Sequence, residues 1–205
     1  MTASTLNKND LMGYSPLDSL SISPRGGVDA EVILKECRHA GKLILRGTGT
    51  DKKFLSLTKK ILIKELPTTP NVCEISKEIT SVWLGPDEWL LVTKPGQEKQ
   101  LEKKLKGTLS KLRHAVVDVS DNSTIIQIAG PRARELIMKG CSVDVHPRVF
   151  GPGSAVQTNL AHANVILWQK DEIPSYNLMV RSSFAIYLWN WLLDSTSEFN
   201  TRIEV

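Results

Sequence analysis

The feature that most constrains the fold is a recurring unit in which one or two strands are followed by a helix. Short runs rich in β-formers alternate with runs of helical periodicity, and helix starts are expected near Asp51, Gln97, Pro131 and Ser183. Consecutive strands joined by tight turns pair antiparallel, and a following helix covers one face of their sheet. The sequence therefore predicts an α+β fold of repeated strand–strand–helix units with mainly antiparallel sheets.

Strands are predicted where apolar runs are bounded by turn residues, at 42–46, 79–84, 88–93, 115–119, 124–129, 165–168 and 177–180. Asp51 is a suitable N-cap for the first helix. The second helix repeats leucine at helical spacing, with lysine and glutamate opposite. Pro131 suits the first turn of the third helix, and Gly140 its stop.

The helix that begins near Ser183 is apolar on two sides. One stripe holds Phe184, Tyr187, Leu188, Trp191 and Leu192, and the other holds Ile186, Trp189 and Leu193. A helix with two apolar sides is typically buried on both. Two explanations stay open: an interior helix of this chain, or a helix whose second stripe is covered by a partner. On the second interpretation, Trp189→Ala combined with Trp191→Ala would weaken assembly.

The composition is that of an ordinary globular protein, with 41% apolar and 23% charged residues among 205. The formal charge of +4 is mild, so the lysines at 99–106 predict a solvated helix face and not a nucleic-acid surface. Residues 1–15 are polar, and a disordered or extended N-terminal arm is expected there. Residues 16–205 form either one domain or two ferredoxin-like lobes, at about 30–112 and 113–205.

The three cysteines, Cys37, Cys73 and Cys141, are far apart and odd in number. This pattern argues against a disulfide framework or a thiolate metal site. The longest apolar run, at 184–193, is interrupted by Asn190 and is too short to cross a bilayer. Residues 1–9 lack the apolar core of a signal peptide. We therefore expect a cytoplasmic protein.

A search for reactive residues finds none. Gly47-Thr48-Gly49 resembles the start of a dinucleotide fingerprint, but Lys52 stands where the third glycine is needed, so a turn is favoured. The histidines are scattered, at His39, His114, His146 and His162, and none has enough neighbouring ligands for a metal. Asp118 and Ser120 are typical of a tight turn. No catalytic, cofactor-binding or metal-binding residue is predicted.

Four motifs carry a family resemblance. The stretch 83–92 is similar to the signature of the gamma subunits of heterotetrameric sarcosine oxidase, and three further stretches follow in the same order, at 117–141, 143–153 and 180–189. Together with Ser15-Pro16-Leu17 they cover residues 15–195. Residues taken from these motifs as family-motif or interface positions are Trp83, Gly85, Pro86, Asp87, Trp89, Asp118, Gly130, Pro131, Arg181, Phe184, Tyr187 and Trp189.

The chain also resembles, more distantly, the folate-binding fold of the glycine-cleavage T-protein, an aminomethyltransferase. The folate enzymes carry a glycine-rich segment ending in paired aspartates before the strand that begins at Glu88, but here residues 76–80 lack the acidic pair. Their Tyr-Thr-Gly-Glu turn is replaced by residues 171–175. Because a carboxylate orients folate and steers its protonation, the resemblance implies a scaffold whose site has been emptied.

The resemblance implies a non-catalytic gamma subunit of the oxidoreductase that converts sarcosine to glycine, with peroxide formed and a one-carbon unit passed to tetrahydrofolate. It implies alpha, beta and delta subunits as partners and no cofactor in this chain. FAD, FMN, NAD and tetrahydrofolate would belong to the large subunits and zinc to the delta subunit. The alternative is a free-standing folate-binding or aminomethyl-transferring protein, because a fold does not by itself establish a function.

Overall fold

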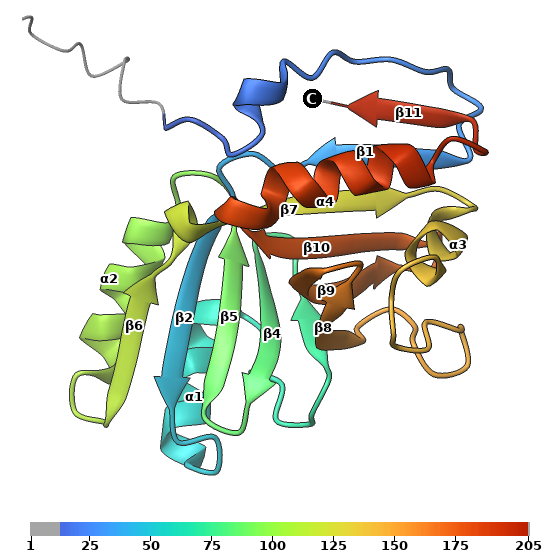
Figure 1. Ribbon diagram of the computed structural model, residues 1–205. Helices are drawn as coiled ribbons and strands as arrows, with labels where there is room; N and C mark the ends of the chain where they lie inside the picture. Colours follow the sequence, from blue (N-terminus) through green and yellow to red (C-terminus); the bar gives the residue numbers. More distant parts are fainter. Residues whose placement is uncertain (1–12, 205) are drawn as a thin grey trace, which may run out of the picture.

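The computed structural model describes residues 13–204, which form two β-sheets between two layers of helices (Figure 1). The six-stranded sheet has the order β11 (Thr201–Glu204), β1 (Val32–Glu36), β7 (Ser123–Ala129), β10 (Ser175–Arg181), β9 (Ala163–Asp171) and β8 (Ala155–Leu160). The five-stranded sheet has the order β3 (Cys73–Ile75), β4 (Ile79–Gly85), β5 (Glu88–Thr93), β2 (Gly41–Gly47) and β6 (His114–Asp118). Only β1 and β11 pair parallel among these strands.

The predicted α+β class with mainly antiparallel sheets is confirmed. All seven predicted strands are present, and the four predicted helices are α1 (Lys52–Leu62), α2 (Glu98–Leu109), α3 (Ala133–Met138) and α4 (Ser182–Ser195). Sequence reasoning missed β1, β3, β8 and β11. Two 3₁₀ turns, η2 (Asp18–Leu20) and η3 (Ser120–Asn122), complete the described elements. None of the helices within residues 13–204 combines the length and apolar character needed to cross a membrane.

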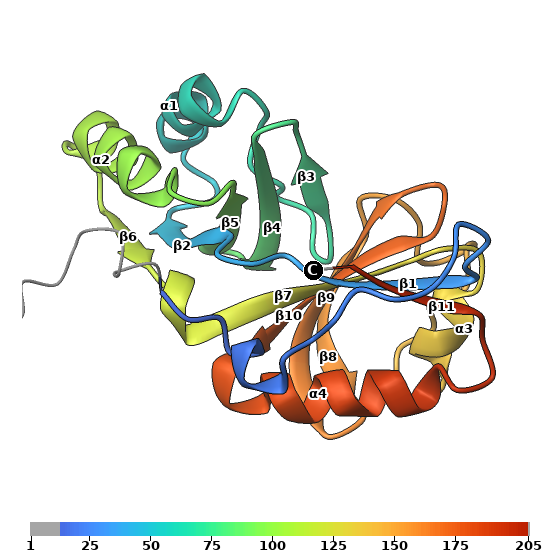
Figure 2. The same cartoon turned by 90° about the horizontal axis from the view of Figure 1, so that it is seen from above.

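Helices α1 and α2 cover the outer face of the five-stranded sheet (Figure 2). Asp51 caps α1 as predicted, its carboxylate accepting from the Lys53 backbone N–H at 2.8 Å. Alternate residues of the strands, such as Leu43 and Leu45, point into this layer and meet Phe54 of α1 and Leu105 of α2. Apolar residues recur at every second position of the strands and every 3.6 residues along the helices, and together they form one core.

Helices α3 and α4 cover the outer face of the six-stranded sheet (Figure 2). The buried face of α4 consists of Ala185, Leu188, Trp189 and Leu192, at the i, i+3, i+4, i+7 spacing of one helix side. Trp189 belongs to the second predicted stripe but is only 1% exposed, so that stripe is not exposed as a whole. Exposed apolar residues flank the buried face instead: Phe184 (44%), Ile186 (40%) and Tyr187 (38%).

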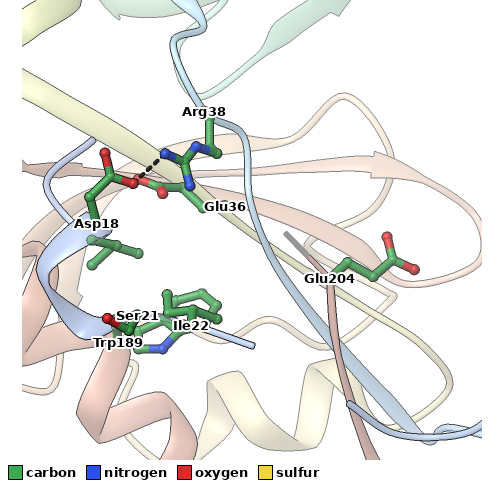
Figure 3. A pocket seen from close by; sticks show the side chains of 8 residues that line it. Asp18, Ser21, Ile22, Glu36, Arg38, Trp189 and Glu204 are labelled. Carbon is green, nitrogen blue, oxygen red and sulfur yellow. Dashed lines mark hydrogen bonds and ion pairs between the residues drawn. The ribbon is translucent and has the colours of Figure 1, made fainter. Parts of the chain in front are cut away.

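The segment that enters from the N-terminus packs over β1. Residues 1–12, most of the expected arm, lie outside the described residues, but Ser15 and Leu17 are buried. The Glu36 Oε1 atom accepts from the hydroxyls of Ser15 (2.5 Å) and Thr124 of β7 (2.6 Å). Asp18 forms an ion pair with Arg38 beside a small pocket of about 170 Å³ (Figure 3). These contacts tie the entering segment to the six-stranded sheet.

The inner faces of the two sheets meet in an inner cluster that consists of Ala40, Cys73, Val82, Leu90, Ile125, Ala155 and Trp168. Backbone hydrogen bonds join the sheets at one edge, where the Cys73 N–H donates to Gly153 O at 2.7 Å and the Ala155 N–H donates to Asn71 O at 2.9 Å. Two pockets adjoin the inner cluster: one is lined by its members Ala40, Ile125 and Trp168, and the other by apolar residues packed against it.

Candidate functional site

One of these two pockets, of about 540 Å³, coincides with the place where the sequence departs from the folate enzymes. Its lining includes residues 75–80, which lead into β4, and Lys170, which directly precedes the turn at 171–175. We call it the lysine-rimmed pocket because its basic lining residues are Lys35, Arg38, Lys77, Lys94 and Lys170. Two segments far apart in the sequence therefore meet at one site.

The two carboxylates in the lining of this pocket already have partners. Glu36, 5% exposed, is held by the hydroxyls of Ser15 and Thr124. The Glu78 Oε1 atom accepts from Lys94 Nζ at 2.9 Å. A general base must be free to receive a proton from a bound molecule. Both carboxylates have structural partners at Oε1: Glu36 ties the N-terminal segment to the six-stranded sheet, and Glu78 is ion-paired with Lys94.

The two other groups with altered acidity in this region are also unsuited to catalysis. Burial raises the pKa of the Cys37 thiol, so the reactive thiolate is suppressed at neutral pH. Burial lowers the pKa of Lys42, which could favour a nucleophilic amine. However, Lys42 is 2% exposed, and its Nζ donates to Ala40 O at 2.8 Å. Within residues 13–204, no three His, Cys, Asp or Glu side chains lie close enough to bind a metal together.

The motif residues between β4 and β5 form a hairpin. Trp83 and Trp89 are opposite each other in the β4–β5 register, and Pro86 and Asp87 form the turn between the strands. Gly85, the last residue of β4, pairs with Glu88. The Trp89 ring is fully buried, and its Nε1 donates to Pro67 O at 2.7 Å. This signature therefore stabilises the fold and does not supply a reactive group.

Two further motif positions have local structural roles. Asp118 Oδ1 accepts from the backbone N–H of Ser120 at 2.9 Å and from its hydroxyl at 2.6 Å, which confirms the turn interpretation. Gly130 has φ of +110°, and a Cβ atom there would lie 2.4 Å from Glu31 O. Only glycine fits such a position. Pro131 follows it, exposed, ahead of α3.

The remaining motif residues lie at the junction of β10 and α4. Arg181 ends β10 and is exposed, and Phe184 and Tyr187 follow on the first turns of α4. Trp189 belongs to the core instead. The motif residues thus divide into the β4–β5 hairpin, two turns, the core residue Trp189 and this exposed junction. Sequence reasoning missed Glu36 and Ser123, because polar residues inside short apolar strands carry no signal of their partners.

The glycines at Gly47-Thr48-Gly49 have a packing role. A Cβ atom on Gly47 would lie 2.3 Å from the Phe54 ring, so its absence lets α1 pack tightly against β2. This close approach explains the glycine without any bound nucleotide.

The fold defines the class of protein first. A glycine cleavage system aminomethyltransferase T from Bartonella henselae has a TM-score of 0.63 at 12% identity, covering 86% of this chain and 48% of that chain. At that identity the likeness concerns the fold alone. The chain thus has the α+β architecture expected from its resemblance to the T-protein.

The family follows from closer relatives. The family model described as "Sarcosine oxidase, gamma subunit family" matches residues 46–198. A sarcosine oxidase subunit gamma from Corynebacterium sp. (strain P-1) is 33% identical over 201 residues, 97% of each chain. A chain of the heterotetrameric sarcosine oxidase from Corynebacterium sp. U-96, solved with pyrrole 2-carboxylate, has a TM-score of 0.81 at 30% identity, covering 92% of this chain and 97% of that chain. The chain belongs to the sarcosine oxidase gamma subunit family.

Proposed function

We propose that this chain serves a heterotetrameric sarcosine oxidase as a subunit without a reactive site, and that its surfaces hold the other subunits together. The observation that carries this proposal is the similarity to gamma subunits over 97% of both chains. Similarity over almost the full length of both chains supports the same role in the complex for this chain. Sarcosine oxidase is an oxidoreductase, so the chain would act within an enzyme without performing the chemistry itself.

The geometry of the lysine-rimmed pocket supports the absence of a reactive site. Its two carboxylates are engaged, and burial keeps the Cys37 thiol protonated. Lys77 and Lys170 are the pocket-lining lysines without an ion pair among residues 13–204. Cations alone cannot accept a proton from a substrate.

The exposed apolar residues on α4 and β6 support a role in assembly. Phe184, Ile186 and Tyr187 lie on α4, and Val117 of β6 is 52% exposed. In addition, β6 is an edge strand whose outer side has no strand partner among the described residues. Exposed apolar groups and free strand edges are features that partner proteins cover.

We propose the alpha, beta and delta subunits as the partners of these surfaces. On this proposal, FAD, FMN, NAD and tetrahydrofolate are bound by the large subunits and zinc by the delta subunit. The engaged carboxylates of the lysine-rimmed pocket support placing folate elsewhere.

Co-purification tests the proposal. A tagged copy of this chain, co-expressed with the alpha, beta and delta subunits from the same organism, should elute with them as one particle of fixed stoichiometry. Separately, calorimetric titration of the isolated chain with tetrahydrofolate should give no saturable heat. Elution of the chain alone, or folate binding by the isolated chain, would revive the alternative of a free-standing folate protein.

A further inference from the structure

The second pocket between the sheets has a volume of about 870 Å³, and we call it the inter-sheet cleft. Its walls come from both sheets, with Ile44 and Leu84 on the five-stranded sheet and Ile166, Met179 and Arg181 on the six-stranded sheet. It lies apart from the lysine-rimmed pocket, with which it shares no lining residue.

Two side chains in the cleft have unused hydrogen-bonding capacity. Ser123 is 4% exposed, yet its Oγ has no hydrogen-bond partner among the described residues. A buried hydroxyl without a partner costs free energy, so a native structure normally satisfies it. Arg181 has no ion pair within residues 13–204, although twelve ion pairs occur in that range. Ser123 therefore lacks the partner that its burial requires, whereas Arg181 is exposed and its guanidinium is free of ion pairs among these residues.

Ser123 and Arg181 are directly opposite each other in the β7–β10 register. Directly opposite residues of an antiparallel pair point to the same face, with Cβ atoms about 5 Å apart. Both side chains line the cleft, so both face the space between the sheets. A hydroxyl donor beside a guanidinium matches the two oxygens of a carboxylate. The structure thus places two matched donors at one end of the cleft.

The rest of the lining fits a segment of polypeptide. Amide side chains, which pair well with backbone groups, are contributed by Asn122, Asn159 and Asn164, whereas the Gln157 amide already donates to Leu84 O. Apolar contact is available from Ile44, Leu84, Ile166 and Met179, and Glu88, the acidic residue of the lining, is ion-paired with Arg46. Arg181, at one end of the cleft, directly precedes α4, and Phe184 lies in the first turn of that helix. The chain carries a net charge of +4, which complements an acidic partner.

We propose that the inter-sheet cleft receives an acidic side chain of a partner subunit, whose carboxylate is bound by Arg181 and Ser123. This inference rests on the proposed function and adds to it a binding site for one partner segment. The partner's neighbouring residues would cover the apolar wall, and the amide side chains would pair with its backbone.

Substitution at the cleft tests the proposal in the assembled complex. Arg181→Gln should weaken co-assembly about tenfold or more, because the partner carboxylate would be buried without its cation. Ser123→Ala should weaken it severalfold. Arg148→Gln, which removes an exposed arginine in the loop between α3 and β8, is the matched control and should assemble like the parent. Urea unfolding of each isolated variant should give the parent midpoint, so that lost assembly reports on the interface.

Chemical coupling identifies the contact directly. In the complex with Arg181→Lys, a carbodiimide should couple the introduced amine to a carboxylate of another subunit, and mass spectrometry should locate both peptides. The inference fails if Arg181→Gln assembles as tightly as the parent, or if no cross-link to another subunit forms at this position. Benzoate is the small-molecule carboxylate probe. The inference also fails if benzoate binds the isolated chain saturably and Arg181→Gln abolishes that binding without affecting assembly, because Arg181 would then bind a small carboxylate and not a partner subunit. Failure of the unsubstituted chain to co-purify would instead refute the proposed function.

Discussion

The Cys73 thiol couples the stability of the fold to pH. It is 3% exposed beside Val82, its cross-strand partner, and burial raises its pKa from an ordinary 9.0 to about 12. Above pH 9 the thiol ionises in the unfolded chain but stays protonated in the folded chain. The free energy of unfolding therefore falls as pH rises from 9 toward 12, by up to about 1.4 kcal/mol per pH unit from this group.

We therefore expect Cys73→Ala to flatten this fall. The variant should lose about 1 kcal/mol at pH 8 through the cavity left by the thiol. Between pH 8 and pH 10 it should lose about 1.4 kcal/mol less than the parent in urea unfolding. Val82→Ala removes volume from the same cluster without removing a thiol and should keep the parent's pH dependence. Equal slopes for the parent and Cys73→Ala would contradict the assignment.

Glu36 gives a second prediction at the scale of single residues. Its Oε1 atom is shared by two hydroxyls, so Ser15→Ala leaves a buried carboxyl group with one donor fewer. The variant should lose about 1–3 kcal/mol in urea unfolding. Limited proteolysis should also cut the segment around residues 15–22 faster, because one of its ties to β1 is gone. Ser23→Ala is the control, since Ser23 is exposed, and wild-type proteolysis of Ser15→Ala would refute the expectation.

At the scale of elements, α4 separates folding from assembly. Trp189 is 1% exposed and packs with the six-stranded sheet, so Trp189→Ala should cost about 3–5 kcal/mol in urea unfolding of the isolated chain. Loss of assembly in that variant would reflect a damaged fold, which corrects the expectation that removing Trp189 and Trp191 reports on an interface. Phe184→Ser changes a 44%-exposed residue and should leave stability within about 0.5 kcal/mol.

Phe184→Ser should nevertheless weaken assembly, because the exposed flank of α4 is the surface that we propose a partner covers. Native mass spectrometry of the co-expressed complex checks this, with Ser183→Ala on the same exposed turn as the control. A Phe184→Ser complex that forms like the parent would remove α4 from the proposed interface.

At the scale of the whole molecule, hydrophobic periodicity was sufficient to predict the class of fold. The predicted strands and helices were long or strongly periodic, such as the leucine repeat buried on α2. The four missed strands are short or lie at or near an edge, where tertiary pairing and not local pattern decides the conformation. For α4, the pattern could not decide which apolar side faces the sheet, because both sides contain large apolar residues.

The pockets were less predictable than the fold. The two segments at the lysine-rimmed pocket could be noted as departures from the folate enzymes, but their meeting point depends on how the sheets pack. The Ser123–Arg181 pair depends on the register of β7 with β10, and a one-residue slip would place these side chains on different faces. Sequence alone does not give that register.

The exchange of strands between the two halves of the chain favours one domain over two lobes. Strand β1 pairs with β7, for example Leu34 with Ile128, although it precedes the five-stranded sheet in the sequence. Conversely, β6 follows residue 112 yet pairs with β2, as Leu45 does with Val116. A boundary at 112/113 would separate both strands from their partners. We therefore propose that residues 16–205 form a single domain.

A single domain should unfold in one cooperative step, since neither sheet is complete without a strand from the other half. Tryptophan fluorescence and far-UV circular dichroism should give coincident urea transitions. Leu45→Ala and Leu178→Ala remove fully buried side chains from the outer cores of the five-stranded and six-stranded sheets, respectively. Each should shift both signals together, by about 2–5 kcal/mol. A biphasic transition in which Leu45→Ala moved only one phase would show two separately folding lobes, because only then could the loss of one core leave the other sheet unaffected.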